Sequence, residues 1–237
     1  MYGAVIMLIV ALDFDNKEKA LNLVKELEDS VKYYKVGLEL FSRAGIDVVR
    51  EISSMGKKVF LDLKYHDIPN TVKSAARVAV EAGVFMYNLH ALGGFELMRE
   101  VAEFNREYAE KLGVERPLLI AVTVLTSMKE EDLREVGIEK PLNEEVLRLA
   151  ELAKRAGLDG VVCSAKEVRL IKNNLGEDFI TVTPGIRPLW AAKDDQKRVV
   201  TPKMAKELGT DFIVVGRPIT RAENPKEAAE RILEELQ

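Results

Sequence analysis

The amino-acid sequence predicts an α/β fold, a single-domain (β/α)8 TIM barrel that spans residues 1–237. Two observations lead to this prediction: eight short apolar runs recur along the chain, and amphipathic helical patterns separate them. Eight such units within 237 residues match a barrel close to its smallest size. Because no linker rich in Pro, Gly or Ser divides the sequence, one domain is expected.

Each apolar run is continuous rather than alternating, which is typical of parallel strands that are covered on both faces. In chain order the expected strands are 5–12, 34–38, 59–63, 85–89, 118–125, 160–163, 179–182 and 212–215. Helical patterns such as 17–27 and 71–82 follow the strands and supply the crossovers that parallel pairing requires. A doubly wound open sheet uses the same alternation of elements and is the alternative.

Helix ends and long connections complete this pattern. The segments before four of the strands end in a glycine that is typical of a helix C-cap: Gly56, Gly83, Gly157 and Gly209. Two connections, 127–143 and 184–199, are long for a compact domain, and such loops are often lids or binding loops. Both follow strands, so we expect them at the carboxyl-terminal face, where barrels build their active sites.

The composition excludes several classes of function. The net charge is −4, from 35 Lys and Arg against 39 Asp and Glu, and no basic cluster could follow a phosphate backbone, which argues against nucleic acid. The single Cys163 excludes an internal disulfide, and His66 and His90 are too few for a Cys/His zinc set. The run 5–12 is too short to cross a membrane. A cytoplasmic protein with a small-molecule ligand is expected.

Charged residues gather where the third expected strand ends. Asp62 and Lys64 are two positions apart, so they share one face of the strand and project into the barrel mouth, with Asp67 on the loop beyond. Lys35 on the second strand and Asp13 at the end of the first are expected on the same face. Charges inside a barrel are costly unless they are paired, so this pattern predicts a functional site. A solvated, charged strand end is the alternative.

A second group of residues follows the last two expected strands. Gly185 and Arg187 come after the seventh strand, and Gly216 and Arg217 come after the eighth. Barrels commonly bind phosphate at this position, where glycine lets the backbone approach closely and arginine offers a two-pronged donor. The alternative is that these are turn glycines beside exposed arginines.

These residues, taken in order, resemble one known family. The motifs are Leu12-Asp13, Lys35-Val36-Gly37, the string Asp-Leu-Lys-Tyr-His-Asp-Ile-Pro-Asn-Thr at 62–71, Leu125-Thr126-Ser127, Thr183-Pro184-Gly185-Ile186-Arg187 and Val215-Gly216-Arg217-Pro218-Ile219. From Leu8 to about Pro225 the chain is similar to the orotidine 5'-monophosphate decarboxylases, in their compact bacterial form. The string at 62–71 is the most specific of the motifs.

The resemblance implies that the protein removes CO₂ from C6 of orotidine 5'-monophosphate (OMP) to give UMP in de novo pyrimidine biosynthesis, with no metal and no organic cofactor. It implies that Lys64 stabilises the developing charge at C6 and then protonates it, and that Asp62 lies beside the leaving carboxylate. Lys35 and Asp67 would hold these two side chains in place.

The resemblance also implies how substrate is bound. Phosphate would contact Gln196, Gly216 and Arg217, together with Arg187, while the connection 184–199 closes over the site. Thr126 would lie near the pyrimidine, and Asp13 and Lys35 near the ribose hydroxyls. The family pattern further implies a homodimer with a shared active site. The residues that would complete the neighbouring subunit's site are Asp67, Ile68 and Thr71.

Two other functions remain open at this point. The Asp-x-Lys-x-x-Asp skeleton also resembles the Mg²⁺-dependent sugar-phosphate lyases and decarboxylases of the hexulose-phosphate synthase type. Those relatives carry a metal-binding carboxylate where this chain has Lys35, and a cation at that position would repel a metal ion. A barrel that binds a phosphorylated ligand without turnover is the third possibility.

Overall fold

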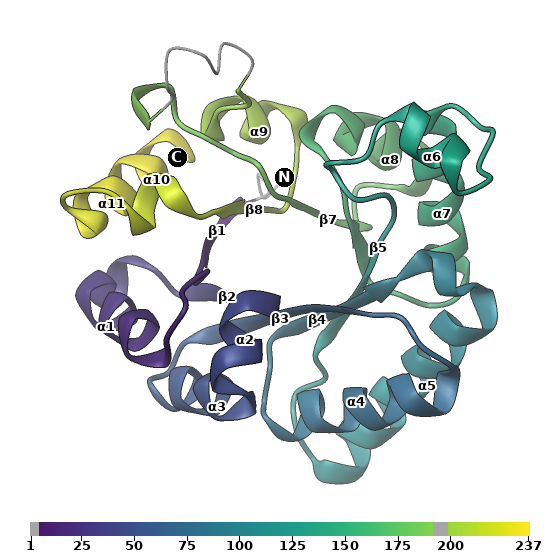
Figure 1. The fold of residues 1–237 in the computed structure, drawn as a ribbon, viewed down its shortest axis with the longest axis horizontal. Coiled ribbons are helices and arrows are strands. Elements are labelled where there is room, and N and C mark those ends of the chain that lie inside the picture. Colours follow the sequence, from purple (N-terminus) through teal and green to yellow (C-terminus); the bar gives the residue numbers. More distant parts are fainter. Residues whose placement is uncertain (1–4, 192–198) are drawn as a thin grey trace.

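The computed structural model describes residues 5–191 and 199–237, and its strands close into a barrel (Figure 1). Neighbouring strands are parallel and follow one another in chain order, and β8 pairs with β1. The predicted (β/α)8 barrel is therefore confirmed, and the alternative of an open sheet is wrong. The strands are β1 (Met7–Ala11), β2 (Tyr33–Gly37), β3 (Lys58–Tyr65), β4 (Met86–His90), β5 (Leu118–Val122), β6 (Gly160–Val162), β7 (Ile180–Thr183) and β8 (Phe212–Val215).

Helices form a ring outside the barrel (Figure 1). They are α1 (Lys17–Leu27), α2 (Leu38–Ala44), α3 (Ile46–Ser54), α4 (Pro69–Glu81), α5 (Phe95–Leu112), α6 (Glu130–Glu135), α7 (Leu142–Arg155), α8 (Val168–Leu175), α9 (Pro202–Leu208), α10 (Arg217–Thr220) and α11 (Pro225–Glu235). The first helix has the predicted bounds, and Asn16 caps it by accepting from the backbone N–H of Lys19. Within residues 5–191 and 199–237, no helix has the length and apolar character needed to cross a membrane.

Side chains fill the interior of the barrel in layers, beginning at its amino-terminal end. There the rings of Tyr33, Phe85 and Phe212 pack together, with centroids 5.2 to 5.9 Å apart. A layer of apolar side chains lies above them: Ile9, Ala11, Phe60, Met86, Ile120, Val182 and Val214. Inward-facing positions recur every second residue, so Lys35 follows Tyr33 and Asp62 follows Phe60 into the next layer. The layer that contains Lys35 and Asp62 lines a cavity at the carboxyl-terminal end.

Two strands differ from the prediction at their carboxyl ends. The fifth strand was expected to reach 125, but β5 ends at Val122, and the next residues turn into the wall of a cavity. The third was expected to end at 63, but β3 continues to Tyr65 and carries a shift of register against β4. Apolar patterning ended the predicted strand at Leu63 because Lys64 is charged, although its backbone still belongs to the sheet.

The two long connections differ in structure. The connection 127–143 contains the short helix α6, whose first turn is acidic. In the connection 184–199, a parallel bridge joins Ile186 to Val200, so the two ends of the connection lie side by side. Residues 192–198, and with them the predicted phosphate ligand Gln196, lie outside the described part of the chain.

Candidate active site

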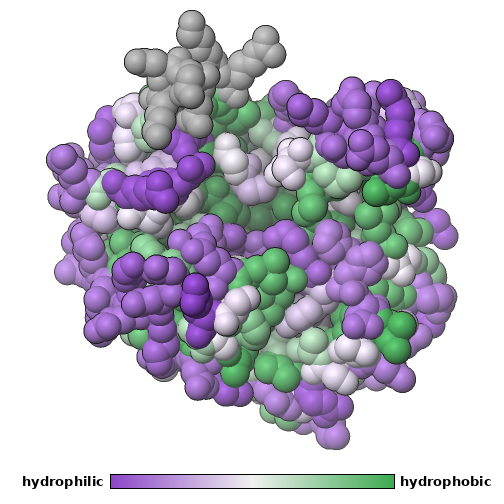
Figure 2. Space-filling model, viewed as in Figure 1, coloured by the Kyte–Doolittle hydropathy of each residue, from purple (hydrophilic) through white to green (hydrophobic). Residues whose placement is uncertain are grey.

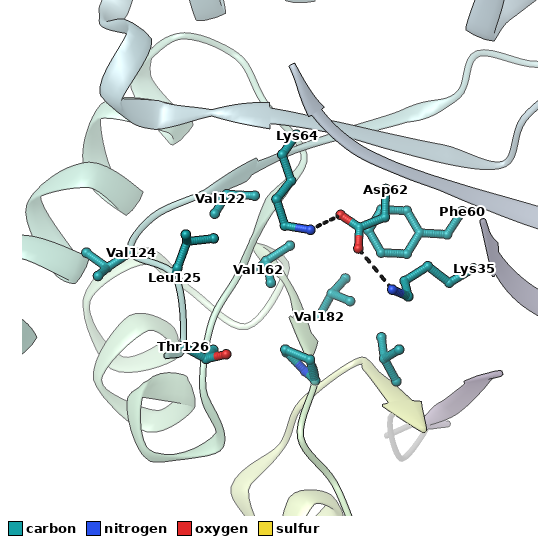
Figure 3. Close-up of a pocket in the computed structure, with 12 residues that line it drawn as sticks. Lys35, Phe60, Asp62, Lys64, Val122, Val124, Leu125, Thr126, Val162 and Val182 are labelled. Atoms are coloured by element: carbon teal, nitrogen blue, oxygen red, sulfur yellow. Dashed lines mark hydrogen bonds and ion pairs between the residues drawn. The ribbon is translucent and has the colours of Figure 1, made fainter. Parts of the chain in front are cut away.

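A chain of alternating charges lies at the mouth of the barrel (Figure 3). The Nζ of Lys64 lies 2.8 Å from Oδ1 of Asp62, and the Nζ of Lys35 lies 3.3 Å from its Oδ2. Lys35 also reaches Oδ1 of Asp13, at 3.4 Å. The strands β1, β2 and β3 are neighbours, so Asp13 and Lys35 meet the pair Asp62 and Lys64 although they are far from it in the sequence.

The electrostatics of the array centre on Asp62, which is 7% exposed. Burial alone would raise the pKa of its carboxyl group, but Lys35, Lys64 and the amide of Asn88 outweigh burial and hold that pKa below its usual value. The carboxylate is therefore ionised between two ammonium groups. This arrangement places fixed charges of both signs at the end of an otherwise apolar barrel.

The array forms one side of a cavity of about 200 Å³ (Figure 3). The opposite side comes from later strands and is mostly apolar: Val122, Val124, Leu125, Thr126, Val162, Val182, Pro184 and Val214. Figure 2 shows the molecule hollowed near its centre, with apolar side chains in the hollow and hydrophilic ones around it. Such a cavity fits a flat ring that presents an anionic group to the lysines.

Thr126 is the one hydroxyl side chain in the lining of this cavity, as far as the described residues go. It also lines another cavity, of about 450 Å³, which lies at the carboxyl ends of β5, β6 and β7. The neighbouring Ser127 lines neither of these two. Thr126, the residue predicted to lie near the pyrimidine, is therefore accessible from the 200 Å³ cavity.

A second cavity, of about 460 Å³, adjoins the other end of the array. Asp13 lines it, and so do Gly216 and Arg217, which lie where β8 passes into α10. A further arginine, Arg221, lies one turn along and lines the same cavity. The carboxylates of Asp15 and Glu39 line it as well. Two guanidinium groups beside a backbone bend suit a phosphate group, and Asp13 links this cavity to Lys35.

Arg187 occupies a different position from Arg217. Its guanidinium donates to the carbonyl of Ala191, at 2.9 Å, and its backbone N–H donates to the carbonyl of Val200. These bonds hold it within the loop that follows β7, and it lines neither the 200 Å³ nor the 460 Å³ cavity. A contact between Arg187 and phosphate would require its guanidinium to leave the carbonyl of Ala191.

The segment after β3 corrects one expectation. Asp67 was expected to converge with the other four charges, but its carboxylate accepts from the backbone N–H of Ile68, at 2.7 Å, and no ion pair joins it to the array within the described residues. Asp67, Ile68 and Thr71 are all exposed, with 67% of Ile68 accessible. None of these three side chains lines the 200 Å³ cavity of its own chain.

One residue of the site was missed in the sequence. Asn88 of β4 is completely buried, accepts from the backbone N–H of Lys64 at 2.9 Å and donates to Oδ1 of Asp62 at 2.8 Å. The available signal was a lone amide in the apolar run Met-Tyr-Asn-Leu-His at 86–90. A polar residue at an inward position of a buried strand needs a partner, and here it has two.

The two histidines lie beside the array without joining its ion pairs. The rings of His66 and His90 are 5.4 Å apart, and Nδ1 of His90 is buried with no hydrogen-bond partner among the described residues. Burial, followed by the charges of His66 and Lys64, lowers the pKa of His90, which favours its neutral form.

The donors that a metal ion would need are not grouped together in the part of the chain that the structure describes. There, no three residues among His, Cys, Asp and Glu lie close enough to hold a metal ion. Asp62, the best-placed carboxylate, already has an ammonium group against each of its oxygens. A divalent cation at this position would meet two positive charges.

Comparison with known proteins agrees with this geometry. Residues 7–232 match the family described as "Orotidine 5'-phosphate decarboxylase / HUMPS family". The chain is 53% identical over 229 residues to an orotidine 5'-phosphate decarboxylase of Legionella pneumophila (strain Corby), covering 97% of this chain and 98% of that one. It is 50% identical over 232 residues to the protein of the same name in Syntrophomonas wolfei, covering 97% of each.

Solved structures extend the likeness to the fold. The crystal structure of orotidine 5'-phosphate decarboxylase from Lactobacillus acidophilus superposes with a TM-score of 0.87 at 45% identity, covering 98% of this chain and 99% of that one. That of the enzyme from Pyrococcus horikoshii OT3 gives 0.75 at 27% identity, covering 97% and 99%. The chain therefore belongs to the orotidine 5'-phosphate decarboxylase / HUMPS family.

Proposed function

We propose that this protein is a carboxy-lyase that converts OMP to UMP and CO₂ in pyrimidine biosynthesis. The observation that carries the proposal is the chain Lys35, Asp62, Lys64 at one side of an apolar cavity, next to a second cavity whose lining includes two arginines. Relatives that are about half identical over nearly the whole chain are named for this reaction, which supports the proposal.

The chemical difficulty of the reaction explains why fixed charges are needed. When the bond between C6 and the carboxyl carbon breaks, its electron pair stays on C6, in the plane of the ring. The ring carbonyls cannot take up that pair, so the charge must be stabilised electrostatically from outside the ring. An ammonium group held in an apolar cavity stabilises such a charge more strongly than water would.

Lys64 is the residue proposed to supply this charge and then the proton. Its Nζ faces the cavity and is held by Asp62 at 2.8 Å. In the proposed step CO₂ leaves, the electron pair at C6 takes a proton from Nζ, and Lys64 becomes a neutral amine that is reprotonated from water. No other reactant is consumed, so the reaction as proposed needs no metal ion and no organic cofactor.

Asp62 and Lys35 have complementary roles in this proposal. Asp62 lies beside the substrate carboxylate and keeps Lys64 oriented, while Lys35 holds the far oxygen of Asp62. Lys35 and Asp13 are also proposed to contact the ribose hydroxyls, because their ion pair lies where the two cavities adjoin. The two cavities would then hold the two ends of one nucleotide.

Phosphate is proposed to bind in the 460 Å³ cavity, with Gly216 and Arg217 as its ligands. Arg187 and Gln196 are kept as proposed phosphate ligands from the loop after β7, although Gln196 lies outside the described residues. Thr126, at the opposite wall of the smaller cavity, is proposed to meet the pyrimidine. Binding of phosphate would contribute to catalysis by closing the loop over the site.

The protein is further proposed to act as a homodimer with shared active sites. Asp67, Ile68 and Thr71 would enter the cavity of the neighbouring subunit, which fits their exposure and their separation from the array of their own chain. The cytoplasm stays the predicted location.

The experiment that tests the proposed function follows the ultraviolet absorbance of OMP, because loss of the carboxyl group changes the pyrimidine chromophore. Purified protein should convert OMP to UMP at the same rate with and without EDTA. A folded protein that converts OMP only when Mg²⁺ is present, or that converts a sugar phosphate instead, would favour the lyase alternative.

A further inference from the structure

Asn88 occupies an unusual place in the barrel. It is completely buried in β4 on the inward face, directly above Met86, yet it is not among the residues that line the cavity. Both ends of its amide are used: Oδ1 accepts from the backbone N–H of Lys64 at 2.9 Å, and Nδ2 donates to Asp62 at 2.8 Å. One side chain therefore contacts both residues that carry the proposed chemistry.

The pairing of β3 with β4 shows why an amide is needed here. Leu61 pairs with Tyr87, and the next pair is Tyr65 with Leu89. Asn88 alone thus stands opposite the three residues Asp62, Leu63 and Lys64, an irregularity in the ladder of the kind that re-aims side chains next to active sites. The side-chain oxygen of Asn88 satisfies the backbone N–H of Lys64, which the partner strand's own backbone leaves without an acceptor.

The backbone conformation of Lys64 gives a further reason for its hydrogen bond to Asn88. Its φ is 51°, in the left-handed region, and Glu28 is the only other residue besides glycine with a positive φ in the described part of the chain. A side chain disfavours this conformation, so it persists only where the surroundings hold it. The hydrogen bond from the N–H of Lys64 to Asn88 is a contact that holds it.

The second bond of the amide acts on Asp62. The Nδ2 of Asn88 and the Nζ of Lys64 both donate to Oδ1, while Lys35 pairs with Oδ2. A planar amide that is fixed at one end by Lys64 can present its Nδ2 in only one direction, so the carboxylate plane is fixed as well. The distance between the ammonium and the carboxylate is thus set by one rigid group.

We propose that Asn88 is a positioning residue for decarboxylation, whose carboxamide holds the left-handed backbone of Lys64 and orients the carboxylate of Asp62. The inference rests on the proposed function, because its effect is measured on that reaction. A positioning role of Asn88 can be distinguished from a packing role by measurement, because loss of packing alone would affect folding rather than the step in which charge develops at C6.

The test compares the kinetics of Asn88→Ala with those of Asn105→Ala. Asn105 is a matched control: it is also completely buried, and its amide also makes two bonds, to Tyr87 and to the carbonyl of Pro117, but outside the barrel. For each folded variant, kcat and KM for OMP, the affinity for UMP and the dependence of kcat on pH are measured, together with Tm.

Asn88→Ala is expected to lower kcat about a hundredfold, because small misplacement of reacting groups has effects of this size. KM for OMP and the affinity for UMP should change less than about threefold, since neither depends on the transition state. The acid limb of the kcat profile should move to higher pH, because the carboxylate of Asp62 loses a donor. Asn105→Ala should lower Tm and leave kcat and the profile unchanged.

A second variant, Asn88→Asp, keeps the volume and the acceptor for Lys64 but loses the donor and adds a negative charge beside Asp62. Its kcat should be low at neutral pH and recover on acidification, when the two carboxyl groups share a proton and one can donate again. This variant keeps the proposal testable if Asn88→Ala fails to fold.

The inference is wrong if Asn88→Ala retains kcat within about threefold of the wild type, or if Asn88→Asp has wild-type activity at neutral pH. A loss of kcat that is equal in Asn88→Ala and Asn105→Ala would also overturn it, because that loss would follow from stability alone. These results presuppose a wild-type enzyme that decarboxylates OMP. A wild-type enzyme that does not would overturn the proposed function instead, and the inference with it.

Discussion

Lys64 and Asp62 are two positions apart on β3, and their side chains are joined by a contact of 2.8 Å from Nζ to Oδ1. In a regular strand the side chains of such residues share a face, and their Cα atoms stand about 7 Å apart. The left-handed backbone at Lys64 and the register shift beside it accompany this direct ion pair. The pair therefore lies where the sheet departs from regular geometry.

The dependence of activity on pH should follow the carboxyl group of Asp62. Its pKa is lowered in the folded protein, so it stays ionised to a lower pH than an ordinary Asp, and its contribution is lost as the pH falls through the folded value. The acid limb of the wild-type activity profile should therefore lie below the pH at which an ordinary Asp titrates. Circular dichroism at each pH separates loss of activity from unfolding.

The variant Lys35→Met tests whether Lys35 lowers the pKa of Asp62. It removes one of the two ammonium groups beside Asp62, so the pKa of the carboxyl group should rise and the acid limb of kcat should move to higher pH. An acid limb at the same pH in both proteins would mean that Asp62 does not govern it.

Binding of the phosphate group should depend on Arg217. Removing a charge-assisted contact to phosphate costs about 1.5–3 kcal/mol, so Arg217→Ala should raise KM for OMP by about tenfold to about 150-fold. Turnover of the nucleoside orotidine, which lacks phosphate, should be unchanged. Arg148, which pairs with Glu145 on the outer helix α7, gives the control: Arg148→Ala should leave both substrates unaffected.

The shared active site can be tested by mixing two inactive proteins. Lys64→Ala removes the proposed proton donor, and Asp67→Ala removes a residue that is proposed to act in the neighbouring subunit. After subunit exchange, one site of each hybrid dimer has both residues intact, so activity should return to about a quarter of that of the wild type if half of the dimers are hybrids. Mixtures that stay inactive, although both variants fold and exchange, would contradict a shared site.

Stability should depend on a network at the opposite end of the barrel. The Nζ of Lys172 is buried and donates to the carbonyls of Glu177 and Phe179 and to the carboxylate of Asp211, at 2.6 Å. Asp211→Ala leaves that ammonium without its counter-charge, so the free energy of unfolding should fall by about 3 kcal/mol or more. Urea unfolding measures the fall, and kcat of the folded variant should be unchanged.

Much of the fold could be predicted because its signals are local. Continuous apolar runs mark strands buried on both faces, and all eight expected runs overlap the observed strands. The first helix could be placed to the residue because Asn16 is a strong N-cap. Strand ends were less accurate, since at β3 a charged residue continues the sheet, and at β5 apolar residues leave it to line the cavity.

Some residues of the site could be predicted from the sequence, and others could not. Asp13, Lys35, Asp62 and Lys64 could be grouped because strand order and two-residue spacing place them together. Asp67 was placed with them wrongly, because the direction in which a loop turns is not encoded in spacing. Asn88 was missed because its importance comes from the register between β3 and β4, which apolar patterning does not reveal.

The central claim is that Lys64, held by Asp62, drives decarboxylation and supplies the proton. The most direct test measures conversion of OMP to UMP in D₂O by the wild type and by Lys64→Ala, with UMP affinity as the control for an intact site. The wild type should form UMP that carries deuterium at C6, and Lys64→Ala should be slower by about a thousandfold or more with UMP still bound. A Lys64→Ala protein that forms UMP at the wild-type rate would contradict the account.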